Sequence, residues 1–495
     1  MQKNNLENKK TVNKEVDNSI FSQTIQLARP FLNILPEIKT PLQSLGVNDK
    51  LVWTILSIIV YSIASQVPLY GITNVDNTDS FGWLRVMMAS NRGTLMDLGI
   101  GPVITASMIM NFLTTAKLII VDSSVYEDKL LSDCFQKIIT LLVTFIQGFI
   151  QVYAGYYGPS DKIPFINKFI IFFQLICSGV MIILLDELLQ KGYGYGNGVN
   201  LFIASNACSK FMWSAFSPRV FHTARGLEFE GCIISTFYVL FARKNKFSAL
   251  IEVLVRENLP NLLQFIYTIL IFSVVIYIQQ LRVDLNVISS KAKGISEVYP
   301  INLLYTSTTP AVILSQVTSN FCMISKLLYS NFPNNKIVRL MGVWDFKINV
   351  GNVPISGISY LLTPPFSFYD GISRPFYLLF YISFNLIASA FISKNWTDNQ
   401  SDSSAKVYQK FKENGMIIKG VRETNTYNVL NDNITIASIL SGLVTASVIM
   451  FCDITSTISS GTNMFLAASI INQYVKMVME DSYTSGRSKW FSEIE

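Results

Sequence analysis

Long runs of apolar residues that contain almost no charged side chains recur along this 495-residue chain. A helix needs about 20 consecutive apolar residues to cross the hydrocarbon core of a bilayer. The clearest runs are 51–70, 98–116, 138–160, 169–185, 258–281, 301–325, 375–393, 433–452 and 454–475. Only 15% of the residues are charged, against roughly a quarter in a soluble globular domain. The sequence therefore predicts an all-α polytopic membrane protein.

Two weaker runs compete for one further crossing. The run 197–216 is long enough but contains Lys210, whereas 231–242 is short and suits an interfacial or partly inserted helix. We place the crossing at 197–216, which gives ten transmembrane helices with both termini on one side. Lysine and arginine are more frequent in the tails and loops of that side, so the positive-inside rule makes it cytosolic.

Three of the runs, 98–116, 301–325 and 454–475, are rich in serine, threonine and asparagine. Small polar residues let helices pack closely in a membrane, and this is one interpretation. Their concentration in three runs favours helices that line a hydrated path or a seam that opens. No acidic or basic residue lies at the centre of a run, so such a path would be gated without the ionisable relays of ion-coupled pumps.

The connection 71–97 carries an amphipathic stretch. Its apolar and basic side chains include Phe81, Trp83, Leu84, Arg85, Val86 and Met87. From the residues alone, the stretch would either lie on the membrane surface or fold back into the protein.

The predicted cytosolic loop 394–433 is basic, and loop 281–300 adds charge to the same face. The basic residues of the two loops are Arg282, Lys291, Lys293, Lys406, Lys410, Lys412, Lys419 and Arg422. A solvated charged surface or contact with phospholipid would explain them. The more specific interpretation is contact with a polyanion.

Several kinds of chemistry are disfavoured by the composition. The chain has one histidine, His222, and six scattered cysteines, which do not form the patterns of a zinc site, a Ser–His–Asp triad or a disulfide framework. The glycine-rich stretch 192–198 lacks the Lys-Ser/Thr of a phosphate-binding loop. We expect no enzymatic activity, no catalytic residues, no metal and no cofactor.

Longer strings of the sequence are more specific than any single motif. They include LPEI at 35–38, ASNRGTLM at 89–96, LLDELLQKGYGYGNG at 184–198, LFIASN at 201–206, FEG at 229–231, ENLPNL at 257–262, RVDL at 282–285 and SGT at 460–462. Together they resemble the SecY family of protein-conducting channels in its eukaryotic endoplasmic reticulum form. The resemblance implies a SecY-type channel of two pseudo-symmetric halves with five spans each, at 51–257 and 258–479. Cytosolic tails at 1–50 and 480–495 would flank them.

The resemblance also implies roles for individual residues. A hydrophobic pore ring would comprise Ile100, Ile104, Val199, Ile203, Val312 and Leu466. The amphipathic stretch would be a plug helix at about 80–90, which favours folding back into the protein. Thr105, Gln147 and Asn320 would form a polar cluster in a lateral gate, and the basic residues of the two cytosolic loops would bind the ribosome.

The implied function is that of the central pore-forming subunit of a channel in the endoplasmic reticulum membrane. Such a channel translocates nascent secretory polypeptides and inserts membrane proteins laterally. The implied partners are small beta and gamma subunits, the ribosome and its RNA, signal peptides, nascent chains, lipid, post-translational translocation factors and a lumenal chaperone. The alternative function is secondary transport of a small solute, which the lack of charges within the spans disfavours.

Overall fold

The computed structural model describes most of the chain, with gaps at the termini and in several connections. The described residues are 29–31, 35–41, 43, 45–72, 89–116, 126–153, 157, 164–223, 226–242, 246, 251, 253–254, 256, 259–289, 296–306, 308–347, 351–365, 371, 373–399, 403–455 and 461–484. The chain divides into two compact units, which are Met1–Val75 with Asn91–Val199 and Asp76–Ser90 with Asn200–Glu495. The predicted halves at 51–257 and 258–479 refer to a symmetry of spans that this division does not test.

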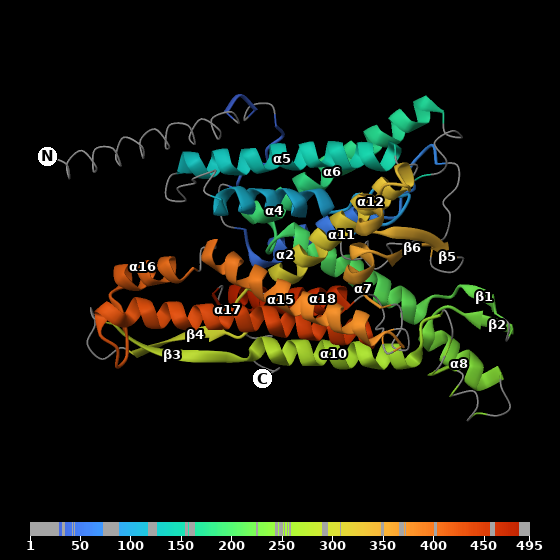
Figure 1. Cartoon of the computed structure of the whole chain (residues 1–495). Coiled ribbons are helices and arrows are strands. Elements are labelled where there is room, and N and C mark those ends of the chain that lie inside the picture. The colour runs from blue at the N-terminus through green and yellow to red at the C-terminus, as the bar shows by residue number, and fades with distance from the viewer. Residues whose placement is uncertain are drawn as a thin grey trace. The chain divides into compact units, whose positions relative to one another are not determined.

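The first unit is helical. Its elements are η1 (Arg29–Phe31), α2 (Val47–Ala64), α4 (Gly101–Thr115), α5 (Tyr126–Tyr153), α6 (Phe165–Leu188) and η2 (Leu189–Tyr193), a short π-helical turn. Helix α5 packs against both α4 and α6, as Figure 1 shows. A core of buried apolar side chains joins α5 and α6 to the connecting segments and comprises Leu69, Leu98, Val152, Tyr157, Ile171 and Leu175.

The second unit combines helices with three small antiparallel sheets. Its helices are α7 (Gly198–Phe216), α8 (Cys232–Ala242), α10 (Leu262–Gln280), α11 (Thr309–Asn331), α12 (Lys336–Met341), α13 (Ile358–Leu362), α15 (Pro375–Asn399), α16 (Ser404–Asn414), α17 (Glu423–Ile454) and α18 (Gly461–Thr484). Its strands are β1 (Val220–Thr223), β2 (Gly226–Phe229), β3 (Arg282–Ser289), β4 (Ser296–Asn302), β5 (Val343–Lys347), β6 (Gly351–Ser356) and β7 (Met416–Ile418). Helix α7 begins at the last residues of the first unit and continues into the second.

Each of the ten predicted spans coincides with a helix. In chain order these are α2, α4, α5, α6, α7, α10, α11, α15, α17 and α18. Within the described part of the chain, seven of them are long and apolar enough to cross a membrane. Helix α4 has only 15 residues, while α7 and α18 carry Asn and Lys side chains that lower their hydropathy. The short run 231–242 is a separate helix, α8, as predicted.

Three predicted segments have boundaries that differ from the structure. The run 301–325 is not helical from its start, because β4 continues to Asn302 and α11 begins only at Thr309, with Pro310 in its first turn. The loop 394–433 is shorter than predicted, since α15 extends to Asn399 and α17 begins at Glu423. The run 138–160 also differs, as α5 starts at Tyr126 and ends at Tyr153.

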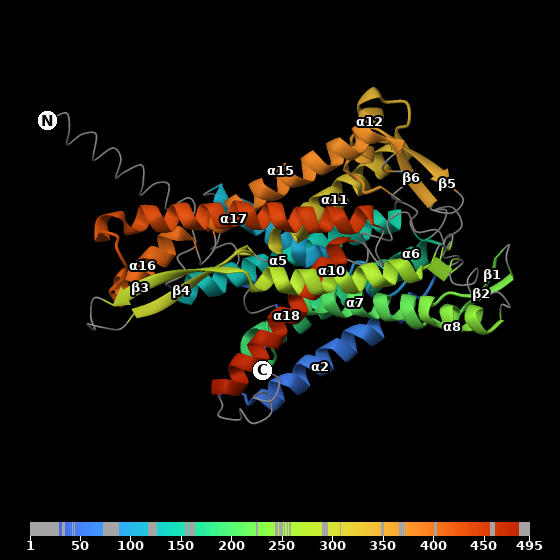
Figure 2. The same ribbon diagram turned by 90° about the horizontal axis from the view of Figure 1, so that it is seen from below.

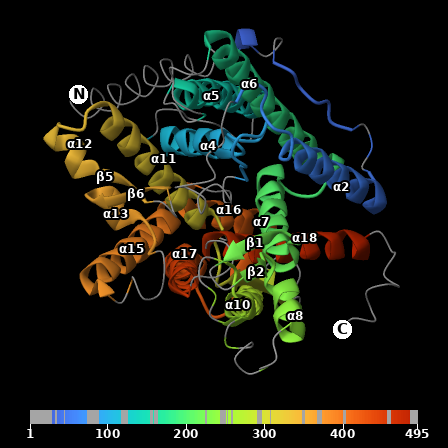
Figure 3. The ribbon, with the colours of Figure 1, turned by 90° about the vertical axis from the view of Figure 1, so that its right-hand side faces the viewer.

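A polar seam joins α15 and α17, which lie side by side in Figures 1 and 3. The hydroxyl of Thr306 lies 2.8 Å from the Ser393 hydroxyl and 2.9 Å from the Ser441 hydroxyl. The Ser389 hydroxyl donates to the backbone carbonyl of Gly442 at 2.8 Å. In hydrocarbon, polar groups need partners within the protein, and here the two helices supply them to each other.

Glycine is needed at position 442 because the two backbones approach closely. A Cβ added there would lie 2.6 Å from the Ser389 carbonyl oxygen, 2.9 Å from the Ser393 Cβ and 3.0 Å from the Ala390 Cα. Two of these three atoms belong to the backbone, so no side-chain rotation relieves the overlap. The close approach of α15 and α17 therefore depends on this glycine.

We expect Gly442→Val to lower the free energy of unfolding by about 3 kcal/mol, the upper end of the range for overpacking. Ser447→Val provides the matched control, since Ser447 lies on the exposed face of the same helix. Thermal unfolding of both purified variants in detergent measures the difference. Equal midpoints for the two variants would show that the seam does not constrain the helix pair.

Candidate functional site

The six predicted pore-ring residues all lie at or near the start of a helix. Ile100 is the residue that precedes α4, and the Ile104 N–H donates to its carbonyl at 3.1 Å, so the two residues are one helical turn apart. Val199 and Ile203 have the same spacing on α7. Val312 and Leu466 lie near the starts of α11 and α18. The predicted ring thus draws on the beginnings of four helices.

The burial of these side chains suits a seal. Ile100, Ile203 and Leu466 are completely buried, Ile104 is 6% exposed, and Val199 and Val312 are half-buried. Ile100, Ile104 and Val199 belong to the first unit and the other three to the second. Closure of the ring across the two units stays a prediction.

The start of α7 is fixed by an acidic residue that sequence analysis did not single out. Asp186, near the end of α6, accepts the Val199 N–H at 3.3 Å through Oδ1 and the Gln190 side-chain amide at 2.9 Å through Oδ2. A carboxylate stabilises the unpaired N–H groups at a helix N-terminus. A Cβ on Gly198 would lie 2.8 Å from the Asp186 Cα, so glycine permits this approach. The acidic pair directly after the apolar run 169–185 was the available signal.

Neighbouring charges fasten the same region to other elements of the first unit. Glu187 Oε1 lies 2.7 Å from Lys137 Nζ on α5 and 2.8 Å from Lys191 Nζ. Lys191 also lies 2.7 Å from Glu37 Oε1 and bonds the Ile38 carbonyl. The hydrogen bond from Lys191 holds the pKa of Glu37 below its usual range. The charged form of Glu37 therefore favours the folded state, and this contribution is lost as the pH falls through that lowered pKa.

The predicted gate residues lie on three helices. The Thr105 hydroxyl donates to the Gly101 carbonyl one turn back in α4, at 2.7 Å. Asn320 on α11 accepts the side-chain amide of the buried Gln316 at 3.2 Å. Gln147 is half-buried on α5. Thr105 and Gln147 belong to the first unit and Asn320 to the second, so their grouping stays a prediction.

The predicted plug residues, Phe81, Trp83, Leu84, Arg85, Val86 and Met87, lie outside the described residues. The basic residues Lys291 and Lys293 also lie outside them.

The two basic loops, which are predicted to be cytosolic, form one body that the sequence did not predict. Strand β3 pairs with β4 along its length and with β7 at its end, where Val287 faces Ile418. The Lys419 N–H continues this pairing by donating to the Asn286 carbonyl at 3.0 Å. Figure 2 shows β3 and β4 beside α16 and the start of α17. We call these strands, α16 and the first turns of α17 the basic module.

The basic module has an apolar interior and a basic surface. Val407 and Phe411 of α16 are buried against Val287, Ile418 and Leu430. The remaining face of α16 and the turn after β7 carry the exposed cations Lys406, Lys410, Lys412, Lys419 and Arg422. Arg282 is also exposed and lies 3.3 Å from Asp284. The fold thus holds six of the eight predicted basic residues on one compact support.

Among the described residues, no group of three or more His, Cys, Asp or Glu side chains could hold a metal ion.

Comparison with known proteins identifies the fold and the family. A family model described as SecY matches residues 94–475, and a model of the plug domain of Sec61p matches residues 59–93. The Sec61 subunit alpha of Dictyostelium discoideum is 40% identical over 464 residues, covering 93% of this chain and 98% of that protein. The corresponding Yarrowia lipolytica subunit is 39% identical over 460 residues, with the same two coverages.

Solved structures agree with this fold. The idle yeast Ssh1 complex bound to the yeast 80S ribosome contains a chain with 26% identity and a TM-score of 0.75, covering 94% of this chain and 96% of that one. Sec61 in the canine ribosome-channel complex from the endoplasmic reticulum has 23% identity and a TM-score of 0.72, covering 92% and 96%. The match to the SecY model spans most of the chain, and the chain therefore belongs to the SecY family.

Proposed function

We propose that this chain is the central pore-forming subunit of a protein-conducting channel in the endoplasmic reticulum membrane. The observation that carries the proposal is the match over 93% of the chain to proteins named as Sec61 alpha subunits in protein transport. The relatives favour polypeptide translocation over the alternative, secondary transport of a small solute. The channel performs no covalent chemistry in this proposal, so the driving force comes from its partners.

The aliphatic ring supplies the barrier to ions. Branched apolar side chains at a constriction resist wetting and so block hydrated ions, while they yield around a polypeptide. The capping of α7 by Asp186 and the ion pairs around Lys191 support the ring by holding the start of α7 in place. The plug would close the path further when no substrate is bound.

Lateral opening uses weak bonds in the gate. Hydrogen bonds between polar side chains of membrane helices contribute about 0.6 to 2 kcal/mol each. Transfer of a sufficiently apolar signal peptide out of water releases more free energy than a few such bonds. Binding of the signal peptide between the gate helices can therefore open the seam without nucleotide hydrolysis.

The basic module is the proposed contact for the ribosome. Its exposed cations face a polyanion, ribosomal RNA, whose phosphates attract lysine and arginine in a strongly salt-dependent manner. Lys291 and Lys293 stand where the family usually has arginines, and lysine lacks the bidentate fork of arginine. In this proposal both termini are cytosolic, small beta and gamma subunits complete the complex, and lumenal chaperones or post-translational factors supply alternative driving forces.

We expect Arg422→Glu to weaken ribosome binding by roughly tenfold at low salt and to lower the slope of log affinity against log salt by about one. Arg339→Glu provides the control, since Arg339 is an exposed arginine of α12 on the predicted lumenal side. Co-sedimentation of the detergent-solubilised complex with ribosomes measures both effects. Equal losses of ribosome binding in the two variants would show that the basic module is not the ribosome contact.

We expect Ile203→Asn to raise the resting ion conductance, because an amide in the ring favours wetting of the constriction. Cys208→Asn places the same side chain on an exposed position of α7 and should leave the conductance unchanged. Single-channel recordings in planar bilayers compare the two variants. A closed, non-conducting Ile203→Asn channel would contradict the assignment of Ile203 to the seal.

A further inference from the structure

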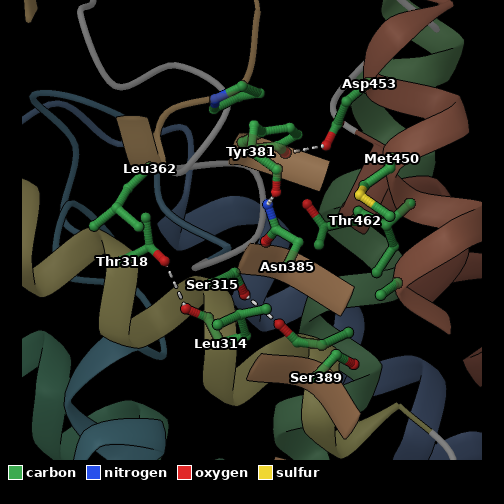
Figure 4. A pocket seen from close by; sticks show the side chains of 14 residues that line it. Leu314, Ser315, Thr318, Leu362, Tyr381, Asn385, Ser389, Met450, Asp453 and Thr462 are labelled. Atoms are coloured by element: carbon green, nitrogen blue, oxygen red, sulfur yellow. Dashed lines mark hydrogen bonds between the residues drawn. The ribbon is translucent and has the colours of Figure 1, made fainter. Parts of the chain in front are cut away.

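A cavity lies within the second unit between α11, α15 and α17, apart from the predicted ring and gate residues. The space between its lining side chains, including open solvent at its mouth, is about 550 Å³. Fourteen residues line it, and Figure 4 shows how their side chains converge. Asp453 alone among them is charged.

Asp453 is held in place by neutral donors. The Tyr381 hydroxyl donates to its Oδ2 at 3.0 Å, and the Gly461 N–H donates to its Oδ1 at 2.9 Å. Among the described residues, no lysine or arginine forms an ion pair with this carboxylate. A carboxylate has about four acceptor sites, so Asp453 retains capacity for further donors.

Three hydroxyl groups of the cavity donate within the protein. The Ser315 hydroxyl donates to the Ala311 carbonyl at 2.6 Å, and the Thr318 hydroxyl donates to the Leu314 carbonyl at 2.9 Å. The Ser389 hydroxyl donates to Gly442 in the seam.

Asn385 donates one amide hydrogen to the Tyr381 carbonyl at 2.9 Å, and its side-chain oxygen and other hydrogen have no further partner among the described residues. For the five side chains Ser315, Thr318, Asn385, Ser389 and Asp453, the capacity that other described residues leave unused is therefore mainly acceptor capacity. A ligand suited to it brings several donors and few acceptors, and an ammonium group has three donors and no acceptor.

The apolar part of the lining defines the rest of the ligand. Side chains of Leu314, Leu362, Pro364, Ile449 and Met450 form apolar walls around the polar groups. Asp453 is the second-last residue of α17, so the charged end of the cavity lies at the end of a predicted membrane span. An amphipathic cation places its apolar body in hydrocarbon and its charged head at such a boundary.

We propose that this cavity binds a small protonated organic amine, with its ammonium group on Asp453, Tyr381 and Asn385 and its apolar arm against Leu314, Ile449 and Met450. The ligand would bridge α11 to the rigid pair formed by α15 and α17. This site is independent of the translocation function proposed above.

Fluorine NMR on the full-length protein in detergent tests the proposal with two probes of similar shape. One is para-fluorophenethylamine, which is protonated at neutral pH, and the other is the neutral para-fluorophenethyl alcohol. We expect the amine to bind more tightly than the alcohol. Asp453→Asn should weaken amine binding by at least about tenfold, equivalent to 1.4 kcal/mol, and leave the alcohol unaffected.

Asp432→Asn is the matched control, because Asp432 is an exposed acid on the same helix α17 and lies roughly 30 Å away along its axis. It should leave amine binding unchanged. Ala446→Leu should also weaken amine binding, since it fills the cavity without altering its charge.

Equal binding of amine and alcohol, or amine binding that survives both Asp453→Asn and Ala446→Leu, would overturn the proposal. Amine binding could also be lost when sodium chloride replaces potassium chloride at the same ionic strength. Such a loss would mean that the sodium ion competes for the cavity. The cavity would then be a metal-cation site, and the proposal would be overturned.

Discussion

The membrane interior imposes the constraint on which the rest of this structure depends. Polar groups in hydrocarbon need partners inside the protein, yet the spans of this chain are rich in serine, threonine and asparagine. Many of these side chains bond the carbonyl one turn back in their own helix, as Thr105, Thr140 and Thr144 do. Others bond a different segment, as Thr306 bonds Ser441 of α17 and Ser389 of α15 bonds the Gly442 carbonyl of α17. Polar faces can therefore exist inside a stable helical protein.

In the proposed mechanism, this constraint distinguishes the rigid parts of the protein from the parts that would open. The seam between α15 and α17 combines interhelical hydrogen bonds with a glycine that admits close backbone contact, and we regard this pair as a fixed frame. Thr105, by contrast, bonds its own helix, so a change of neighbour does not strand its hydroxyl. Such side chains suit a surface that is exposed to a passing polypeptide in one state and to another helix in the next.

The sequence predicted the helices better than the contacts between distant segments. Hydropathy marks the core of each span, but it does not distinguish the non-helical Thr306 and Thr308 from the helical residues that follow them. The pairing of β3 with β7 joins segments far apart in the chain, and no local pattern indicates that register. The i, i+4 spacing of Val407 and Phe411 was a visible signal for α16. The role of Asp186 depends on a three-dimensional approach to Val199, which spacing alone does not reveal.

Photocrosslinking from α7 tests most directly whether a polypeptide passes the ring. A photoreactive amino acid would replace Ile203 or, as the control, Cys208, which lies on a different face of the same helix. Ribosomes stalled on a secretory precursor would then be added to membranes that contain each variant. We expect strong crosslinks from position 203 to the nascent chain and weak ones from position 208. Equal labelling from both positions, or none from position 203 during active translocation, would contradict it.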